Sequence, residues 1–276
     1  MGESSLSSAA LKAKPELTPD KEKRMELTEH LGELRSRIIR IGLYIVVGAT
    51  ACYYKFQLLY GFLFRPMYVA MAGSKLEWKV VFSNFTEAFF VVLQVSFFAG
   101  LILASPFVIA ELYGFISPAL TKEEKKPLRY VVPMSVVLFA MGVSLAYWTA
   151  SFAIVWFVDY VRLFPNGALY QDPKAYVMFM LKMMGMFGLV FQLPVLLSFL
   201  AWVGMLTAGG MKRTWRHAVL VISVVGLIVT PSNDMFTMLM MIIPVIILYL
   251  GSIILVGFIE KRRKKRMVER ERELDL

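Results

Sequence analysis

Long apolar runs that contain no charged residue alternate with short polar segments along this chain. Five such runs cover residues 88–110, 130–158, 183–211, 217–233 and 235–259, and a shorter run covers 41–54. A helix needs about 20 mostly apolar residues to cross the hydrocarbon core of a bilayer. The shorter run becomes long enough if Arg40 and Lys55 extend their charged ends to the two interfaces. The pattern therefore predicts an all-α, polytopic membrane protein with six transmembrane helices.

The predicted spans are joined by polar segments of very different lengths. The spans cover about 38–56, 87–109, 130–151 with an apolar pattern that continues to 159, 176–202, 215–230 and 235–258. The first connection is too long for a simple turn, so we expect a lid with short helical pieces. The last two spans are separated by little more than Pro231-Ser232-Asn233, which predicts an antiparallel hairpin. Four prolines within or at the rims of spans are expected to kink their helices: Pro106, Pro133, Pro194 and Pro244.

Basic residues lie mostly on one side of this predicted topology. Of the 30 Lys and Arg residues, 23 fall in the N-terminal segment, in two alternate connections and in the C-terminal tail. The positive-inside rule therefore places both termini in the cytoplasm. Hydrophobic residues make up 58% of the chain, so we interpret the net charge of +10 as an orientation signal and an affinity for anionic lipid. Nucleic-acid binding is the rejected alternative.

The same pattern divides the chain into three parts. Residues 1–24 are predicted to form a disordered polar lead-in, 25–259 a six-helix transmembrane domain and 260–276 a basic, charged cytoplasmic tail. No cleavable signal peptide is visible, because the first residues are polar rather than apolar.

Catalytic chemistry is poorly represented in the chain. It contains two histidines, His30 and His217, and one cysteine, Cys52, and none of these is close in sequence to another metal ligand. Serine-hydrolase, nucleotide-binding and zinc-protease motifs do not occur. We therefore expect no enzyme activity, no metal and no cofactor, which leaves binding, transport or scaffolding.

Two glutamates stand out because they occur among many basic residues. Glu33 precedes the first span in His30-Leu31-Gly32-Glu33-Leu34-Arg35, and Glu124 lies in the first cytoplasmic connection. One interpretation is local pairing with Arg37 or Lys125, which contributes little at a wet surface. The other is a pair of carboxylates that binds guanidinium groups of an incoming ligand, where bidentate geometry favours arginine over lysine.

Five motifs in a fixed order carry a family resemblance over about residues 25–260. They are HLGELRSR before the first span, FTEAF at the second, SPFVIAELYGFISPALTKEEKK through the first cytoplasmic connection, FGLVFQLPV in the fourth span and TPSND at the last hairpin. Together they resemble the TatC family of the twin-arginine protein translocase.

The resemblance implies a receptor for signal peptides with two consecutive arginines, in the cytoplasmic (inner) membrane of a prokaryote. It implies single-span partners of the TatA and TatB type, self-association in a multi-subunit complex, and export of folded proteins driven by the proton-motive force. The implied signal-peptide residues are Glu33, Arg35, Pro66, Phe115 and Glu124, and the implied intramembrane polar or partner-facing residues are Gln192 and Asp234.

The sequence departs from the family pattern at two positions. Glu111 stands where the family usually has Gln, and Met238 stands where a Gln is common. Gln192 itself has two interpretations, an internal hydrogen bond or a polar contact to a partner helix. A secondary transporter and a membrane scaffold remain the alternative classes. A transporter predicts ionisable groups that converge near the midplane, often with an internal repeat, and neither is evident.

Overall fold

The structure is a computed structural model that describes residues 19–72, 76–116, 128–164, 167–229 and 235–274. The elements, in chain order, are α1 (Pro19–Tyr54), α2 (Phe56–Ala72), β1 (Glu77–Val80), α3 (Glu87–Ile116), α5 (Leu128–Val161), β2 (Ala168–Gln171), α6 (Pro173–Val190), α7 (Leu193–Val203), α8 (Ala208–Arg213), α9 (Trp215–Val229) and α10 (Met235–Leu274).

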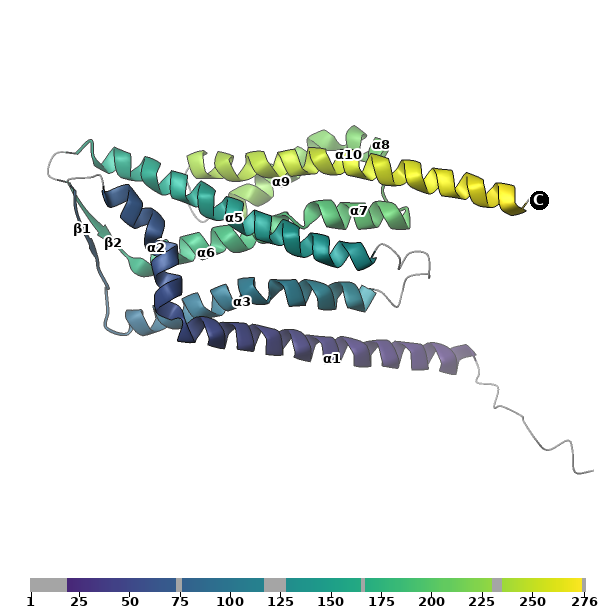
Figure 1. Ribbon diagram of the computed structural model, residues 1–276, viewed down its shortest axis with the longest axis horizontal. Helices are drawn as coiled ribbons and strands as arrows, with labels where there is room; N and C mark the ends of the chain where they lie inside the picture. Colours follow the sequence, from purple (N-terminus) through teal and green to yellow (C-terminus); the bar gives the residue numbers. More distant parts are fainter. Residues whose placement is uncertain (1–18, 73–75, 117–127, 165–166, 230–234, 275–276) are drawn as a thin grey trace, which may run out of the picture.

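The long helices lie side by side along the long axis of the molecule (Figure 1). α1 packs on α3, α5 packs on α6, and α10 packs on α7 and α9. The buried core lies where α2, α3, α5 and α6 meet. We call the end with the start of α1 and the end of α10 the basic end, and the end with β1 and β2 the strand end. The expected helical architecture is confirmed.

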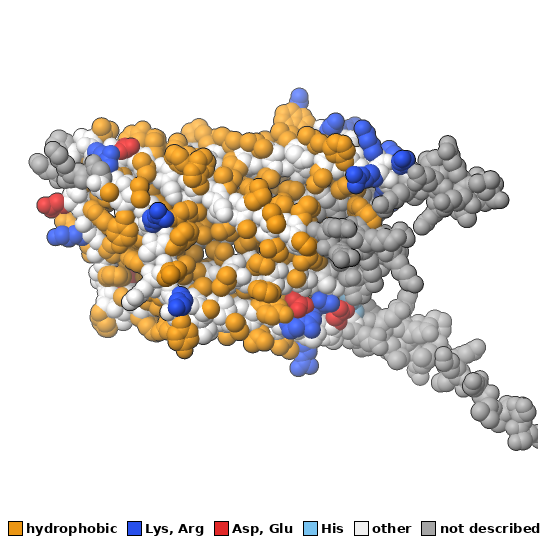
Figure 2. Space-filling model, viewed as in Figure 1, with side chains coloured by type: hydrophobic (Ala, Val, Ile, Leu, Met, Phe, Trp, Pro, Cys, Tyr) orange, Lys and Arg blue, Asp and Glu red, His pale blue; other side chains and the backbone are white. Residues whose placement is uncertain are grey.

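The outer surface of the bundle is apolar over most of its length. Large apolar side chains such as Leu43, Leu103 and Ile247 are more than half exposed. Figure 2 shows them spread over one whole face, with Lys and Arg gathered towards the basic end. A soluble monomer rarely exposes so large an apolar surface, whereas lipid covers it without cost. The chain is therefore a membrane protein.

Among the described residues, five helical segments are long and apolar enough to cross a membrane. They are His30–Tyr54, Glu87–Phe115, Val131–Val161, Pro173–Val203 and Met235–Lys265. α9 has 15 residues and is about 22 Å long, which is shorter than the roughly 30 Å of the hydrocarbon core. The sixth span therefore depends on a short helix that must thin the bilayer locally to cross it. The number of six spans stays a prediction.

Several boundaries differ from those expected. α1 already begins at Pro19, inside the segment predicted to be a disordered lead-in, because proline suits the first helical position and Lys and Glu follow it. At the other end of the chain, α10 continues through the charged tail to Leu274. The first connection forms one 17-residue helix, α2, rather than several short pieces.

The connections that contain β1 and β2 pair through a short parallel sheet, which was not predicted from the sequence. Glu77 of β1 aligns with Ala168 of β2, and Val80 aligns with Gln171. Strands of four residues carry too little alternation to be recognised by their pattern. The sheet holds the two connections together at the strand end.

Prolines within helices leave carbonyl groups without their usual N–H donor. Pro66 frees the carbonyl of Phe62, which accepts a hydrogen bond from the Tyr147 hydroxyl at 3.0 Å. Pro106 frees the carbonyl of Ile102, which accepts one from the Ser105 hydroxyl at 2.6 Å. Such replacement donors allow proline inside membrane helices.

Of the four prolines expected to kink their helices, one lies at a helix break and three lie inside continuous helices. α3, α5 and α10 run through Pro106, Pro133 and Pro244. The fourth predicted span is interrupted between α6 and α7, immediately before Pro194.

The contact between Pro66 and Tyr147 predicts a specific coupling of two substitutions. Tyr147→Phe should lower the free energy of unfolding in detergent by about 1–2 kcal/mol, because the Phe62 carbonyl loses its donor. The loss should shrink towards zero in a Pro66→Ala background, where the N–H restored at position 66 can bind that carbonyl. Tyr176→Phe is the matched control. Its hydroxyl donates to Leu63 O at 3.0 Å, a carbonyl that Pro66 does not affect. Equal losses for Tyr147→Phe in both backgrounds would contradict this account.

Candidate functional site

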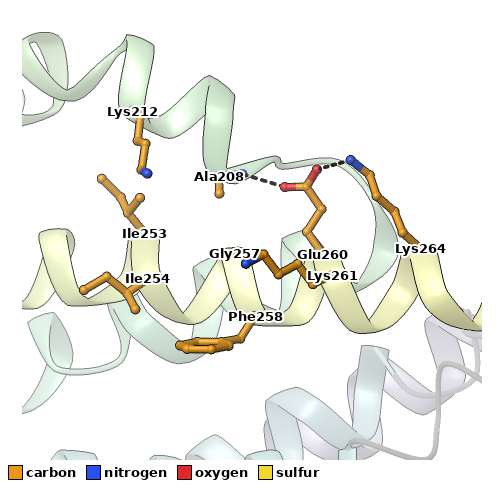
Figure 3. A pocket seen from close by; sticks show the side chains of 9 residues that line it. All are labelled: Ala208, Lys212, Ile253, Ile254, Gly257, Phe258, Glu260, Lys261 and Lys264. Carbon is orange, nitrogen blue, oxygen red and sulfur yellow. Dashed lines mark hydrogen bonds and ion pairs between the residues drawn. The ribbon is translucent and has the colours of Figure 1, made fainter.

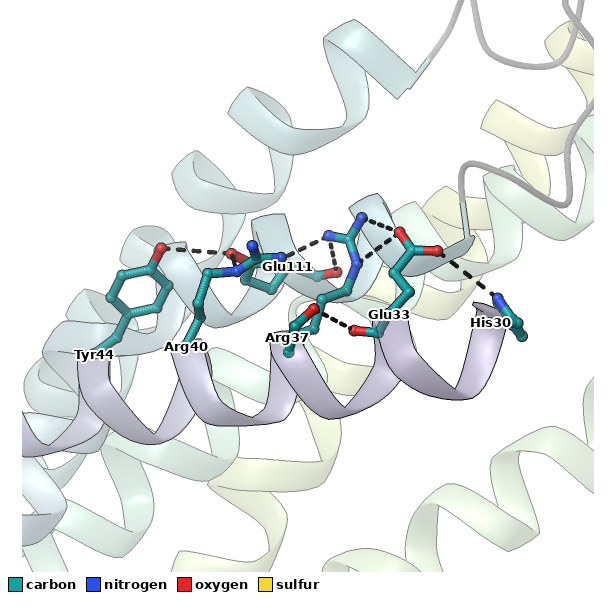
Figure 4. A network of polar contacts seen from close by, with 7 residues as sticks. His30, Glu33, Arg37, Arg40, Tyr44 and Glu111 are labelled. Atoms are coloured by element: carbon teal, nitrogen blue, oxygen red, sulfur yellow. Dashed lines mark hydrogen bonds and ion pairs between the residues drawn. The ribbon is translucent and has the colours of Figure 1, made fainter. Parts of the chain in front are cut away.

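One face of α1 near the basic end carries a regular series of polar side chains. His30, Glu33, Arg37, Arg40 and Tyr44 are spaced three and four residues apart, so they lie along one stripe of the helix. This stripe faces α3, which packs along α1. The end of α3 contributes Glu111, and Figure 4 shows it between Arg37 and Arg40. We call these six residues the α1–α3 network.

Arg37 joins the two acidic residues of the network. Its Nη2 and Nε lie 2.6 and 3.1 Å from Glu33 Oε1. Its Nη1 donates to Glu111 Oε2 at 2.9 Å. The Arg37 and Glu111 side chains are only 17% and 13% exposed. Burial reduces solvent screening, so this pair fixes geometry more firmly than a surface ion pair.

Glu111 also contacts two residues of α1 that lie further from the basic end. Arg40 Nε lies 2.9 Å from Glu111 Oε1, and the Tyr44 hydroxyl donates to the same oxygen at 3.4 Å. Two carboxylates thus face two guanidinium groups, and the charges within the network balance. The arrangement ties three turns of α1 to one residue of α3.

The network requires that α1 and α3 lie very close together. A Cβ at Gly48 would lie 2.7 Å from the carbonyl oxygen of Gly100, and a Cβ at Gly100 would overlap the Ala49 backbone. Nearer the network, a Cβ at Gly114 would overlap the Arg37 guanidinium. Small residues are the usual means of close helix approach in membranes. Glycine at these positions therefore sets the distance at which Arg37 reaches α3.

Glu33 is the member of the network that can still take a ligand. Its Oε1 is bound by Arg37, but its Oε2 lies 3.8 Å from His30 Nδ1, which is too far for a hydrogen bond. Within the part of the chain that the structure describes, no donor reaches Oε2. The Glu33 side chain is 30% exposed. One carboxylate oxygen, on a partly exposed side chain that is fixed through the other oxygen, therefore has no hydrogen-bond donor among the described residues.

The structure brings together some of the predicted signal-peptide residues and separates others. Phe115 stacks on His30 with ring centroids 4.4 Å apart, so it lies beside Glu33. Arg35 is exposed on the same turn of α1. Pro66 is buried in α2, away from the network (Figure 1). Glu124 and Asp234 lie outside the described residues.

Gln192 lies at the break between α6 and α7. Its Nε2 donates to the Ser135 carbonyl at 3.0 Å. Its Oε1 is buried and has no hydrogen-bond partner among the described residues. The donor half of the amide is thus bound internally, while the acceptor half is not.

Sequence reasoning identified Glu33 and its local pairing with Arg37, and it noted Glu111 as a third acidic group. It missed Arg40 and Tyr44, although their spacing from Glu33 was a usable signal. The contact of Glu111 with α1 depends on the register between two helices, which no local pattern gives. No group of three or more His, Cys, Asp or Glu that could hold a metal ion occurs among the described residues.

Comparisons with known proteins agree with each other. The family model for TatC, the Sec-independent protein translocase protein, matches residues 29–244. The chain is 36% identical over 257 residues to a Sec-independent protein translocase protein TatC of Koribacter versatilis, covering 91% of this chain and 93% of the relative. It is 34% identical to TatC of Desulforapulum autotrophicum over 84% of each chain.

A solved structure is also similar. A crystal structure of the twin-arginine translocase receptor TatC superposes with a TM-score of 0.72 at 27% identity, covering 83% of this chain and 99% of the other. This protein therefore belongs to the TatC family of Sec-independent protein translocase subunits.

Proposed function

We propose that this chain is the receptor subunit that binds twin-arginine signal peptides on the cytoplasmic side of a prokaryotic inner membrane. It acts with single-span partners of the TatA and TatB type in a multi-subunit complex. The complex exports folded proteins with energy from the proton-motive force. The chain itself serves transport and does no covalent chemistry.

The free oxygen of Glu33 is the observation that carries this proposal. A guanidinium group of the signal can donate to Oε2 while Arg37 holds Oε1. Glu111 is a positioning residue here, since it occupies Nη1 of Arg37 and so keeps that side chain from closing over both oxygens of Glu33. The carboxylate is thus already oriented before the signal arrives, which reduces the entropy cost of binding.

Glu124 supplies the second carboxylate in this proposal. α3 ends at Ile116 and α5 begins at Leu128, and both ends lie at the basic end with Glu33 (Figure 1). The connection that contains Glu124 therefore joins two helix ends that lie at the basic end, as Glu33 does. Two carboxylates for two arginines explain why the signal needs a pair. Phe115 lies beside Glu33 and offers an aromatic face for a guanidinium. Arg35 is also assigned to signal binding, although two residues from Glu33 it lies on another side of α1. Pro66 then acts on the fold of α2 rather than on the signal.

The proposed orientation of the chain in the membrane rests on the positive charge of the basic end. Its many Lys and Arg residues support, by the positive-inside rule, an orientation with the basic end and both termini in the cytoplasm and the strand end on the other side. In a Cys52→Ser background, an impermeant thiol reagent added outside the cell should label a cysteine placed at Asn166. It should not label one placed at Ser4, and the reverse pattern would refute this orientation.

Partner contact inside the membrane is assigned to Gln192 and Asp234. Oε1 of Gln192 is buried and has no donor among the described residues, so a donor on a partner helix reaches it only if the packing around the break between α6 and α7 opens. The internal bond of Nε2 to Ser135 fixes the direction of that acceptor. Met238, in place of a common Gln, offers no such group.

Photo-crosslinking tests the proposed recognition. A signal peptide with a photoreactive residue next to its arginine pair should crosslink to the connection around Glu124 and to α1 near Glu33. The same peptide with the reactive residue at its C-terminal end is the control and should label neither. Crosslinks confined to the strand end would overturn the proposal.

A further inference from the structure

A cavity lies between α8 and the end of the α10 span, well apart from the α1–α3 network. Its volume is about 400 Å³, within the roughly 300–1,000 Å³ of ordinary ligand sites. Figure 3 shows Lys212 reaching it from α8 and the α10 side chains lining it from below.

The polar side of this cavity carries excess positive charge. Lys212, Lys261 and Lys264 line it, together with one acidic residue, Glu260. Glu260 is already engaged, because it accepts from the Ala208 backbone N–H at 3.1 Å and pairs with Lys264 Nζ at 3.0 Å. Within the described residues, Lys212 and Lys261 form no ion pair. Two ammonium groups are therefore left for an anion.

The other side of the cavity is apolar and faces the lipid. Ile254 and Phe258 line it and are 63% and 59% exposed. The apolar sequence of α10 ends at Ile259, and charged residues follow from Glu260 onwards. The cavity thus lies where the hydrocarbon core meets the headgroup region on the basic end, with its lysines on the headgroup side.

We propose that this cavity binds one anionic phospholipid. The phosphate of its headgroup pairs with Lys212 and Lys261, and an acyl chain packs along Ile254 and Phe258. A free phosphate would use only the lysines and leave the apolar wall empty. A zwitterionic lipid brings a cation that the lysines repel. The bound lipid would add to the existing contacts between α8 and α10, which include the bond from the Ala208 N–H to Glu260 and the bond from the Tyr249 hydroxyl to the Met211 carbonyl.

The test compares two double variants of the full-length protein that change net charge equally. Lys212→Gln with Lys261→Gln removes the lysines of the cavity, whereas Arg213→Gln with Arg262→Gln removes the neighbouring charges that do not line it. Binding of phosphatidylglycerol, phosphatidylcholine and soluble glycerol 3-phosphate is measured in detergent by native mass spectrometry and by the shift in melting temperature.

Phosphatidylglycerol should bind the unmodified protein and raise its melting temperature, and the other two probes should not. The cavity variant should bind it about tenfold more weakly or worse, since two charge-assisted contacts are lost. The control variant should change affinity less than about twofold. If the cavity variant does not fold, Phe258→Ala replaces it and should also weaken binding.

Three results would overturn the proposal. Equal losses in both double variants would mean that charge on the whole basic end attracts lipid without a site. Equal binding of phosphatidylcholine would remove the role of the free lysines. Equal binding of glycerol 3-phosphate would make the cavity a site for soluble phosphate rather than for lipid.

Discussion

Replacing Gly100 by leucine should separate α1 from α3 and abolish signal-peptide binding, although Gly100 contacts no ligand. A side chain there would overlap the backbone of α1 at Gly48 and Ala49, and backbone cannot move aside as a flexible side chain can. Overpacking costs about 1–3 kcal/mol and sometimes more. Here the cost should lie at or above the upper end, because α1 must shift as a whole. Its shift pulls Arg37 and Arg40 away from Glu111.

Gly42→Leu is the matched control for this experiment. Gly42 lies on α1, the helix that Gly100 of α3 contacts, and a Cβ there meets no atom within 4 Å. It should leave the melting temperature in detergent and the peptide affinity almost unchanged. Gly100→Ala should give an intermediate loss. A Gly100→Leu protein as stable as the Gly42→Leu protein would mean that the close crossing of α1 and α3 is not needed.

Glu33→Gln should weaken binding of a twin-arginine signal peptide by about ten- to a hundredfold. A charge-assisted hydrogen bond contributes roughly 1.5–3 kcal/mol, and the amide that replaces the carboxylate carries no charge to attract a guanidinium. The effect should lie near the lower end, because Arg37 already neutralises part of the Glu33 charge. Peptide affinity is measured by fluorescence titration of the purified protein in detergent.

The control for Glu33→Gln is Glu77→Gln at the strand end, where Glu77 is exposed on β1. It removes the same charge without touching the network and should not change affinity. Glu124→Gln should weaken peptide binding to a similar extent as Glu33→Gln. Glu123→Gln is its charge-matched control and should not change the affinity. Equal effects of Glu33→Gln and Glu77→Gln would reduce the role of Glu33 to general surface charge.

The helical membrane architecture could be predicted from the sequence because each span carries its own signal. Charge-free runs of sufficient length are a local property, and α3 and α5 follow them closely, whereas α10 continues beyond its run into the charged tail. The break before Pro194 was also predictable from its residue type. The strands β1 and β2 were not, because each has four residues and gains stability only by pairing with the other.

The candidate site likewise combines features that could be predicted from the sequence with features that depend on the fold. Glu33 and Arg37 are four residues apart on one helix, so the sequence alone indicated their pairing. Glu111 reaches them only because glycines at positions 48, 100 and 114 let α1 and α3 approach closely. Which residues of two helices meet depends on their register and distance, and neither is written in a local pattern. Pro66 could be matched to the family motif, but its separation from Glu33 required the fold.

One binding cycle tests the central claim, that Glu33 recognises an arginine of the signal peptide. The affinities of an Arg-Arg peptide and of a Lys-Lys peptide are measured for the unmodified protein and for Glu33→Gln. A guanidinium can direct two N–H donors at one carboxylate oxygen, as Arg37 does at Glu33 Oε1, whereas lysine presents a point charge, so the unmodified protein should prefer Arg-Arg clearly. In Glu33→Gln that preference should fall by about tenfold, which corresponds to a coupling of roughly 1.4 kcal/mol. An Arg-over-Lys preference that is the same in both proteins would contradict the account.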